Sequence, residues 1–497
     1  MNEIIEDRKP RLTILGLGPG DPRLLTRQAW EILENAREIY LRTQEHPTVK
    51  GFPAPLVIHS FDRYYEESMG YREVYQKIID RVWALSQRPE GMIYAVPGDP
   101  LIAEATVPPL IEKAREHGLS YQIVPGLSFI EAAFSSLGFD PLPQTSLLDA
   151  LEVIEQHHPP FPPDKPVLIA QIYSSQIASE LKLTLMAVYP DLHPVKLIHR
   201  AGNEDQQVED LPLYAIDRSE SIGNLTCLYL PPLEAGTSFE AFQEVIAHLR
   251  APDGCPWDRE QDHQSLRPHL LEETYELIQA LDDDDPQAMR EELGDLLLQV
   301  VLHAQIGYEY GEFTMAEVLK GIHDKLIFRH PHVFQDLDLE NSEQVKQNWE
   351  RLKARERVEN GHKTKGILDG VVSALPALTQ AQTIQQRVAR VGFDWDDMQG
   401  VVDKVGEEIQ ELIQAGSERQ RWQEMGDLLF ALVNLARWLE VDAESALRNA
   451  NQRFRTRFNR LEQVAAARGR VLESLSLEEM DQIWEEIKAD HSADSGR

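Results

Sequence analysis

An acidic motif that occurs twice in the second half of the sequence most constrains what this chain can fold into. The stretch "LLEETYELIQAL" at 270–281 returns in similar form as "VGEEIQELIQAG" at 405–416. A second pair follows, "EELGDLLLQVV" at 291–301 and "QEMGDLLFALV" at 423–433. Within each pair, corresponding acidic residues of the two copies are separated by the same number of positions. This regularity over two separate motifs indicates duplication of a helical unit.

Carboxylates of the first copy fall on one side of the predicted helices. At about 100° per residue, Glu272 points away from the apolar face, whereas Glu273 and Glu276 lie roughly 60° apart near its edge. In the next helix, Glu292 and Asp295 share one stripe of an otherwise apolar surface, which predicts burial in a helical bundle. Buried carboxylates are costly unless they are paired or bound to metal, and no Lys or Arg lies on this stripe. Oxygen ligands suit hard cations, so the pattern predicts an Mg²⁺ or Mn²⁺ site.

The second copy repeats this arrangement, with Glu408 and Glu411 facing inward and Glu424 and Asp427 on the stripe. A single E-E-x-x-E in a chain with 27% charged residues is most often a solvated helix face. Two copies, each followed by E-x-G-D at the start of an apolar helix, favour paired metal sites. The glycine of each E-x-G-D motif is expected to let two helices approach closely.

The chain separates into two halves with different periodicity. Up to about residue 230, strands alternate with helices, as in "RLTILGLGPGDP", "GMIYAVPGDP" and "YQIVPGLSF", which predicts an α/β domain with parallel strands. The proline-rich segment 157–166 is expected to separate two lobes of that domain. Beyond residue 239 nearly everything reads as helix. The predicted organisation is a two-lobed α/β domain at 1–230, a linker at 231–238, two all-α modules at 239–360 and 366–489, and a disordered tail at 490–497.

Composition restricts the possible partners and location. A net charge of −34 argues against nucleic-acid binding, although divalent cations would still allow nucleotides to bind. Two cysteines cannot build a disulfide framework, which indicates a reducing compartment. The sequence shows neither a secretion signal nor an apolar run long enough for a membrane span. We therefore expect a cytoplasmic protein without a membrane partner.

The second half resembles the MazG family of nucleoside triphosphate pyrophosphohydrolases. The resemblance covers about residues 239–489 and rests on "GCPWDREQDHQSLRPHLLEETYEL", "FRHPHVF", "VGFDWDD" and "EMGDLLFALVNLAR", besides the doubled motifs. It implies an all-α fold, normally dimeric, that binds Mg²⁺ and cleaves a nucleoside triphosphate between its α and β phosphates. The implied metal ligands are Glu273, Glu276, Glu292 and Asp295 in the first copy, and Glu408, Glu411, Glu424 and Asp427 in the second.

Cations for a triphosphate are more complete in the second copy. Lys404 lies one turn before Glu408, whereas the first copy has His269 at the matching position. Arg453 and Arg457 share one face of a helix, with a solvated helix face as the alternative. We therefore favour the second copy for turnover, with Lys404, Glu408, Glu411, Glu424 and Asp427 as catalytic residues. The expected nucleotide-binding residues are Lys404, Asn434, Arg453, Arg457 and Trp484, although a Trp at helical spacing is more often part of a core.

The first half resembles the tetrapyrrole (corrin/porphyrin) methylase family. "GLGPGDPRLLT", "YAVPGDPLIAEAT", "VPGLSFIEAA" and "LIHRAG" carry this resemblance over about residues 11–230. It implies a two-lobed α/β methyltransferase that uses S-adenosylmethionine. The segment "YLRTQEHPTV" at 40–49 departs from the biosynthetic members and leaves the substrate open. The implied cofactor-binding residues are Pro19, Gly98, Asp99, Pro100, Ala103 and Ser128.

These features predict one function and leave two alternatives. The expected function is Mg²⁺-dependent hydrolysis of NTP or dNTP to the monophosphate and pyrophosphate by a homodimer, in a house-cleaning role that the resemblance implies. One alternative is an S-adenosylmethionine-dependent methyltransferase whose MazG modules are accessory. The other is a non-catalytic sensor of nucleotides and S-adenosylmethionine.

Overall fold

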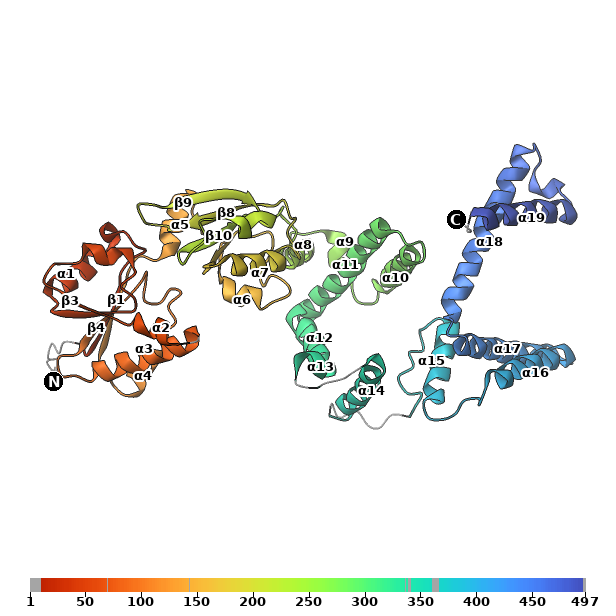
Figure 1. Cartoon of the computed structure of the whole chain (residues 1–497). Coiled ribbons are helices and arrows are strands. Elements are labelled where there is room, and N and C mark those ends of the chain that lie inside the picture. Colours follow the sequence, from red (N-terminus) through yellow and green to blue (C-terminus); the bar gives the residue numbers. More distant parts are fainter. Residues whose placement is uncertain are drawn as a thin grey trace. The chain divides into compact units, whose positions relative to one another are not determined.

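The computed structural model describes residues 10–68, 70–142, 144–335, 337, 341–359 and 366–494. The chain divides after Glu260 into two compact units, the first α/β and the second helical (Figure 1). Helices α8 (Phe239–Arg250) and α9 (Pro256–Glu260) group with the α/β unit, so this division falls beyond the linker expected at 231–238. Among the described helices, none is both long and apolar enough to cross a membrane.

The first lobe of the α/β unit is a five-stranded parallel sheet with the order β3-β2-β4-β1-β5. Its strands are β1 (Leu12–Gly16), β2 (Glu38–Leu41), β3 (Val57–Ser60), β4 (Met92–Val96) and β5 (Tyr121–Val124). Its helices are α1 (Arg27–Asn35), α2 (Arg63–Glu67), α3 (Tyr71–Ser86) and α4 (Val107–Glu116), with the short 3₁₀ helices η1 (Pro22–Leu24) and η2 (Pro47–Gly51). All residues of β1 are buried, as expected for a strand covered on both faces. Because β4, β1 and β5 are parallel neighbours, the loops that follow them meet at one edge of the sheet.

The second lobe is a mixed sheet with the order β6-β7-β10-β8-β9. Its strands are β6 (Ser146–Asp149), β7 (Val167–Ala170), β8 (Pro194–His199), β9 (Gln207–Pro212) and β10 (Thr226–Leu230). Its helices are α5 (Phe129–Leu137), α6 (Ala150–Ile154), α7 (Ser175–Leu185) and the 3₁₀ helix η3 (Leu213–Arg218). The proline-rich segment 157–166 connects α6 to β7, and β6 and β7 are adjacent parallel strands. The expectation that this segment separates the lobes is therefore wrong, because it closes a β-α-β crossover inside the second lobe.

The helical unit confirms the prediction of an all-α second half among its described residues. Helices α10 and α11 form one hairpin, and α16 and α17 form another. In each hairpin a three-residue turn joins the two helices, and its last residue, Asp285 or Ser417, caps the second helix. Helix α19 continues to Asp494, into the segment expected to be a tail, and residues 495–497 lie outside the described residues. The elements are α10 (Arg267–Asp282), α11 (Pro286–Tyr310), α12 (Met315–Arg329), α13 (Pro331–Phe334), α14 (Ser342–Glu359), α15 (Ala377–Ala389), α16 (Met398–Gln414), α17 (Glu418–Trp438), α18 (Ala443–Ala467), η4 (Leu472–Ser474) and α19 (Leu477–Asp494).

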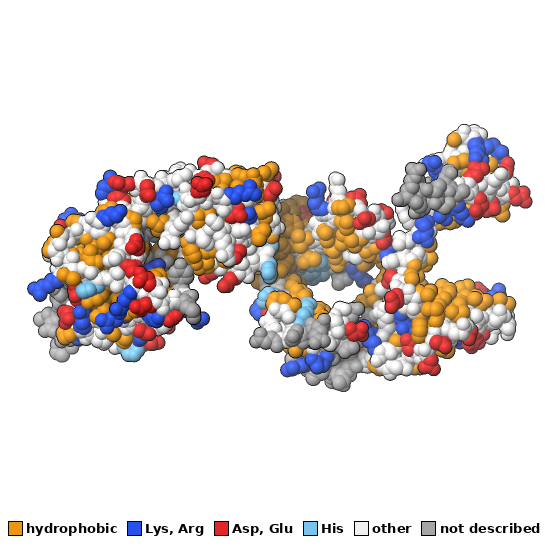
Figure 2. Space-filling view, in the orientation of Figure 1, with side chains coloured by type: hydrophobic (Ala, Val, Ile, Leu, Met, Phe, Trp, Pro, Cys, Tyr) orange, Lys and Arg blue, Asp and Glu red, His pale blue; other side chains and the backbone are white. Residues whose placement is uncertain are grey.

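Each hairpin leaves one apolar stripe uncovered, contrary to the burial expected for these helices. Leu293 is 54% exposed in α11 and Met425 is 46% exposed in α17. Figure 2 shows hydrophobic side chains gathered over the α16–α17 hairpin. No described atom lies within 4 Å of a Cβ placed on Gly294 or Gly426, apart from the backbone of their own helices. Between the described helices, the close approach expected at these glycines is therefore not found. The stripe comprises Leu293, Leu297 and Val300 in α11, and Met425, Leu429 and Leu432 in α17.

Candidate functional site

The first acidic cluster lies where α10 and α11 face each other. Glu273 and Glu276 project from adjacent turns of α10, and Glu292 faces them from α11. One oxygen from each of these three carboxylates lies within 4.8 Å of the others. Burial and then the charges of Asp295, Glu276 and Glu292 raise the pKa of Glu273. The structure thus groups three of the four predicted ligands, and Asp295 acts on them through its charge.

The second acidic cluster has the same construction in α16 and α17. Glu408 faces Glu424 and Asp427, and oxygens of these three residues again lie within 4.8 Å of one another. Burial and then the charges of Glu411, Asp427 and Glu408 raise the pKa of Glu424. Glu411 therefore lies close enough to act electrostatically, although the tight group does not include it. Glu408 is only 5% exposed, so this carboxylate is the most buried of the eight predicted ligands.

A lysine occupies one side of the buried carboxylate in the second cluster. Lys404 Nζ lies 2.8 Å from Glu408 Oε1 and 3.1 Å from Glu407 Oε1. The hydrogen bonds that Lys404 donates to the carboxylates of Glu408 and Glu407 raise the pKa of Lys404. The other oxygen, Glu408 Oε2, is buried and has no hydrogen-bond partner among the described residues. A buried carboxylate oxygen without a donor is costly, so this oxygen, on a residue grouped with two further carboxylates, fits a bound cation.

The first cluster has no equivalent of this lysine. His269 Nδ1 lies 3.7 Å from Glu272 Oε2, on the outward side of α10. Among the described residues, no Lys or Arg forms an ion pair with Glu273, Glu276 or Glu292. Both clusters consist of carboxylate oxygens from two facing helices, and such a donor set suits Mg²⁺ or Mn²⁺.

The residues expected to contact the nucleotide lie on four different helices, with Lys404 on α16 and the others on α17, α18 and α19. Arg453 and Arg457 are on α18, where neither forms an ion pair with another described residue, and Figure 2 shows basic side chains along this helix. Asn434 Oδ1 on α17 accepts a hydrogen bond of 2.9 Å from Arg437 Nε. Trp484 packs on the hydrophobic cluster between α18 and α19, with its ring 5.1 Å from that of Phe454. The structure therefore places Trp484 in a small core, which is the alternative that its helical spacing left open.

The loops that follow β1, β4 and β5 pack directly against one another. Gly98 N donates to Gly18 O at 2.8 Å, and Gly18 N donates to Gly98 O at 3.2 Å. The carboxylate of Asp99 accepts hydrogen bonds from Leu101 N at 2.9 Å and from Gly126 N at 3.2 Å. A Cβ on Gly126 would lie 2.3 Å from Gly98 O. These glycines and Asp99 hold the three loops together, and the ligand contacts expected of Gly98 and Asp99 stay a prediction.

A cavity of about 290 Å³ lies beside these loops, at the boundary of the two lobes. Pro19 and Ser128, two of the predicted cofactor residues, line it together with Glu131, Gly202 and Gln206. Ser128 is the N-cap of α5, and Glu131 Oε2 accepts hydrogen bonds from both its backbone N–H and its hydroxyl. Apolar side chains such as Leu24 and Leu127 contribute more of the lining than these polar groups do.

The loop after β4 carries the other predicted cofactor residues, Gly98, Asp99, Pro100 and Ala103. Ala103 has a left-handed backbone, with φ of 52°. A non-glycine residue in this region is uncommon and is retained only where the surroundings enforce it. The same conformation occurs in Gln171 and Arg200, directly after β7 and β8 of the second lobe.

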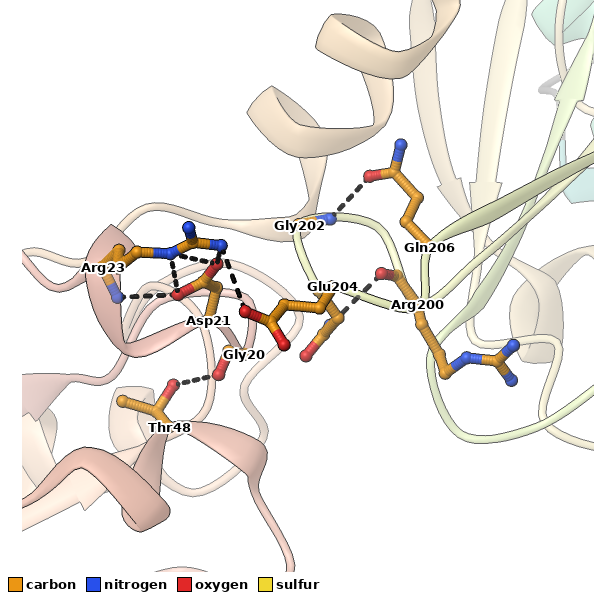
Figure 3. A network of polar contacts seen from close by, with 9 residues as sticks. Gly20, Asp21, Arg23, Thr48, Arg200, Gly202, Glu204 and Gln206 are labelled. Atoms are coloured by element: carbon orange, nitrogen blue, oxygen red, sulfur yellow. Dashed lines mark hydrogen bonds and ion pairs between the residues drawn. The ribbon is translucent and has the colours of Figure 1, made fainter.

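Contacts from two directions hold the Gly-rich loop after β1, and the sequence patterns did not indicate them (Figure 3). Thr48 Oγ1 lies 3.0 Å from Leu17 O and 2.9 Å from Gly20 O. From the second lobe, Asn203 Nδ2 donates to Pro19 O at 3.2 Å. The one available signal was the unusual segment 40–49, which contains Thr48.

Two family models match the chain in the order that this structure shows. The model of tetrapyrrole (corrin/porphyrin) methylases matches residues 11–217, and the MazG nucleotide pyrophosphohydrolase domain matches residues 261–334. Among solved structures, uroporphyrin-III-C-methyltransferase from Thermus thermophilus is similar at 20% identity and a TM-score of 0.35, over 44% of this chain and 91% of that one. At this score the likeness supports no inference about function.

Curated relatives cover the whole chain and its second half. The chain is 39% identical to the uncharacterized protein YabN of Bacillus subtilis, over 96% of this chain and 98% of YabN. Over 51% of its length it is 47% identical to the nucleoside triphosphate pyrophosphohydrolase/pyrophosphatase MazG of Thermotoga maritima, of which it covers 97%. The chain therefore belongs to the MazG family, with a tetrapyrrole methylase domain ahead of its MazG region.

Proposed function

We propose that this protein hydrolyses nucleoside triphosphates to the monophosphate and pyrophosphate with the help of Mg²⁺ or Mn²⁺. The observation that carries this proposal is the pair of carboxylate clusters across α10–α11 and α16–α17. Raised carboxyl pKa values in both clusters, and a Glu408 Oε2 atom without a partner among the described residues, mark them as sites with more negative charge than the neighbouring side chains neutralise. The likeness to proteins named as nucleoside triphosphate pyrophosphohydrolases supports the same reaction.

In this proposal the carboxylate clusters hold the divalent metal ion, and Lys and Arg side chains hold the triphosphate of the substrate. A bound divalent cation would neutralise phosphate charge and lower the pKa of an attacking water. Glu408, Glu424 and Asp427 would hold it in the second module, with Glu411 next to them. Lys404, Arg453 and Arg457 supply positive charge for the triphosphate in an otherwise acidic protein, and we favour the second module for turnover on this ground.

Product analysis tests the reaction directly. Pure protein, Mg²⁺ and a panel of NTPs and dNTPs should yield monophosphate and pyrophosphate. Reaction in H₂¹⁸O then shows which phosphorus is attacked, because the label enters either the monophosphate or the pyrophosphate. Diphosphate plus orthophosphate, or intact nucleotide across the panel, would contradict the proposal and favour a nucleotide-binding role.

We also propose that the protein acts as a homodimer. The stripe on α11 and α17 is too apolar for a solvent-facing surface, and a second copy carries the same stripe. Light scattering coupled to size exclusion should give twice the chain mass. Replacing Leu429, which is 48% exposed, by Glu should shift the protein toward the monomer, whereas a wild-type chain that is monomeric at micromolar concentration would contradict this assembly.

A second activity is favoured by the cavity at the lobe boundary. Pro19, Ser128 and Glu131 line it next to three packed loops at the carboxyl ends of β1, β4 and β5. Ligands bind at this edge in open α/β sheets, so we propose that it takes S-adenosylmethionine. Calorimetric titration with S-adenosylhomocysteine tests this assignment on the full chain. No binding would leave the α/β unit without a methyl donor and refute a methyltransferase role.

A further inference from the structure

The two acidic clusters are built from corresponding carboxylates. They differ in whether a basic side chain neutralises the charge of one of these carboxylates. In the second cluster, Lys404 Nζ contacts Glu408 Oε1 at 2.8 Å, while Glu408 Oε2 has no hydrogen-bond partner in the part of the chain that the structure describes. In the first cluster, Glu273 is the counterpart of Glu408, and His269 contacts Glu272 instead. One cluster therefore carries a built-in counter-ion on a ligand oxygen, and the other does not.

This difference bears on how each cluster takes up a cation. A metal ion that uses both oxygens of Glu408 competes with the ammonium of Lys404 at Oε1 and is repelled by its charge, whereas the carboxylate of Glu273 has no such competitor among the described Lys and Arg residues. Lys404 is able to leave, because its side chain is 35% exposed and its second partner, Glu407, is 56% exposed. The released ammonium would remain one helical turn from the site, where the phosphates of a bound nucleotide would lie.

We propose that Lys404 is an exchangeable counter-ion of the second cluster. Without nucleotide it holds Glu408, so the first cluster binds a divalent cation more tightly than the second. When a metal–triphosphate complex arrives, Lys404 transfers from Glu408 to the triphosphate, and the second cluster fills. The inference deepens the proposed hydrolase function and rests on it, and it makes metal and nucleotide binding cooperative in the second module alone.

Mn²⁺ titration of the metal-stripped full chain, followed by electron paramagnetic resonance, tests the first part. We expect two classes of site at least about tenfold apart in affinity, since a hydrogen bond to a charged group is lost on filling the second cluster. Glu273→Gln should remove the tighter class and Glu408→Gln the weaker class. Lys404→Met should tighten the weaker class by about tenfold or more. Two equal classes in the wild type, or no effect of Lys404→Met, would overturn the proposal.

The exchange itself has a separate readout, because the positive field of Lys404 could weaken Mn²⁺ binding without any transfer. A non-hydrolysable α,β-methylene triphosphate should tighten Mn²⁺ binding at the second cluster of the wild type. This coupling should fall by about tenfold in Lys404→Met. By reciprocity, the factor by which Mn²⁺ tightens nucleotide binding should fall by the same amount. Unchanged coupling would refute the exchange. Absence of Mn²⁺ from both clusters would instead refute the proposed hydrolase function, and the inference with it.

Discussion

Replacing Glu408 by Gln separates the role of this residue in metal binding from its role in folding. The substitution keeps the size of a side chain that is 5% exposed and removes its charge. The amide oxygen of Gln can still accept the hydrogen bond that Lys404 Nζ donates at 2.8 Å. The amide nitrogen would point toward Glu424 and Asp427, which now repel Glu408.

The expected change in stability is small. The ion pair of Glu408 with the partly exposed Lys404 is worth about 0–1 kcal/mol, as for other pairs with one side in water. Loss of repulsion among the three carboxylates offsets part of this amount. The free energy of unfolding of the metal-free variant should therefore stay within about 1 kcal/mol of the wild type, a shift of a few degrees in Tm at most.

The expected change in metal binding is large. Mutation of groups that only support metal ligands typically lowers affinity about 10- to 100-fold, so loss of a direct carboxylate ligand should cost about 100-fold or more. Hydrolysis should fall at least as far if the second module does the work. Glu407→Gln is the matched control, because Glu407 lies on the same turn and contacts Lys404 Nζ at 3.1 Å but faces away from the cluster.

The assays are Mn²⁺ affinity, pyrophosphate release and thermal unfolding on the same preparations. Glu408→Gln should lose Mn²⁺ affinity and pyrophosphate release but keep its Tm. Glu407→Gln should keep Mn²⁺ affinity and pyrophosphate release within about threefold, and its Tm within a few degrees. Hydrolysis near the wild-type rate in Glu408→Gln would refute the assignment of turnover to the second module. The same experiment on Glu273→Gln then tests the first module.

Three further predictions concern pH, packing and a buried ion pair. Burial and neighbouring carboxylates raise the pKa values of Glu273, Glu292 and Glu424, so these groups bind protons more tightly in the metal-free folded protein than in the unfolded chain; the destabilisation that they cause should lessen as pH falls from about 7 to about 5, and the gain in Tm from Mg²⁺ should shrink over that range, whereas a pH-independent gain would contradict the site. Gly126→Ala should destabilise the α/β unit by about 1–3 kcal/mol in chemical denaturation, because its Cβ would lie 2.3 Å from a carbonyl oxygen, while Gly223→Ala meets no atom within 4 Å and should be near neutral. Arg42→Met leaves Glu104, whose side chain is 2% exposed, without its guanidinium and should cost about 3–5 kcal/mol in the same assay, against less than about 1 kcal/mol for Arg27→Met in an exposed pair.

Local periodicity was sufficient to predict much of the site. The helical wheel chose Glu273 over Glu272 and Glu408 over Glu407, and the structure places the chosen glutamates in the clusters. This works because the direction of a side chain on a helix depends only on its position in the chain. The wheel could not show that Asp295 and Glu411 lie outside the tight groups, since that depends on the rotation and spacing of two facing helices.

Predictions about contacts between segments were less successful for a physical reason. The proline-rich segment 157–166 looks like a boundary by composition, but strand pairing places β6 and β7 on its two sides in one sheet. Likewise the pattern around Gly98 and Asp99 did not indicate that these residues join the loops that follow three strands, a role additional to the cofactor binding that we predict for them. Composition reports the local preference of the backbone, and pairing between distant segments decides what the residues contact.

The sequence by itself determined the order of an α/β half and a helical half, the duplication of the acidic motif and the inward side of each acidic helix. These properties follow from apolar residues that recur every two or 3.6 positions and from the constant separation between the two copies of the acidic motif. Both can be read directly from the sequence. Only the tertiary structure decided which strands share a sheet, which apolar stripe stays uncovered, and which oxygen of Glu408 faces Lys404 and which has no partner among the described residues. Hydrogen bonds and burial depend on distances of a few ångströms between residues far apart in sequence, and no pattern of spacing fixes those distances.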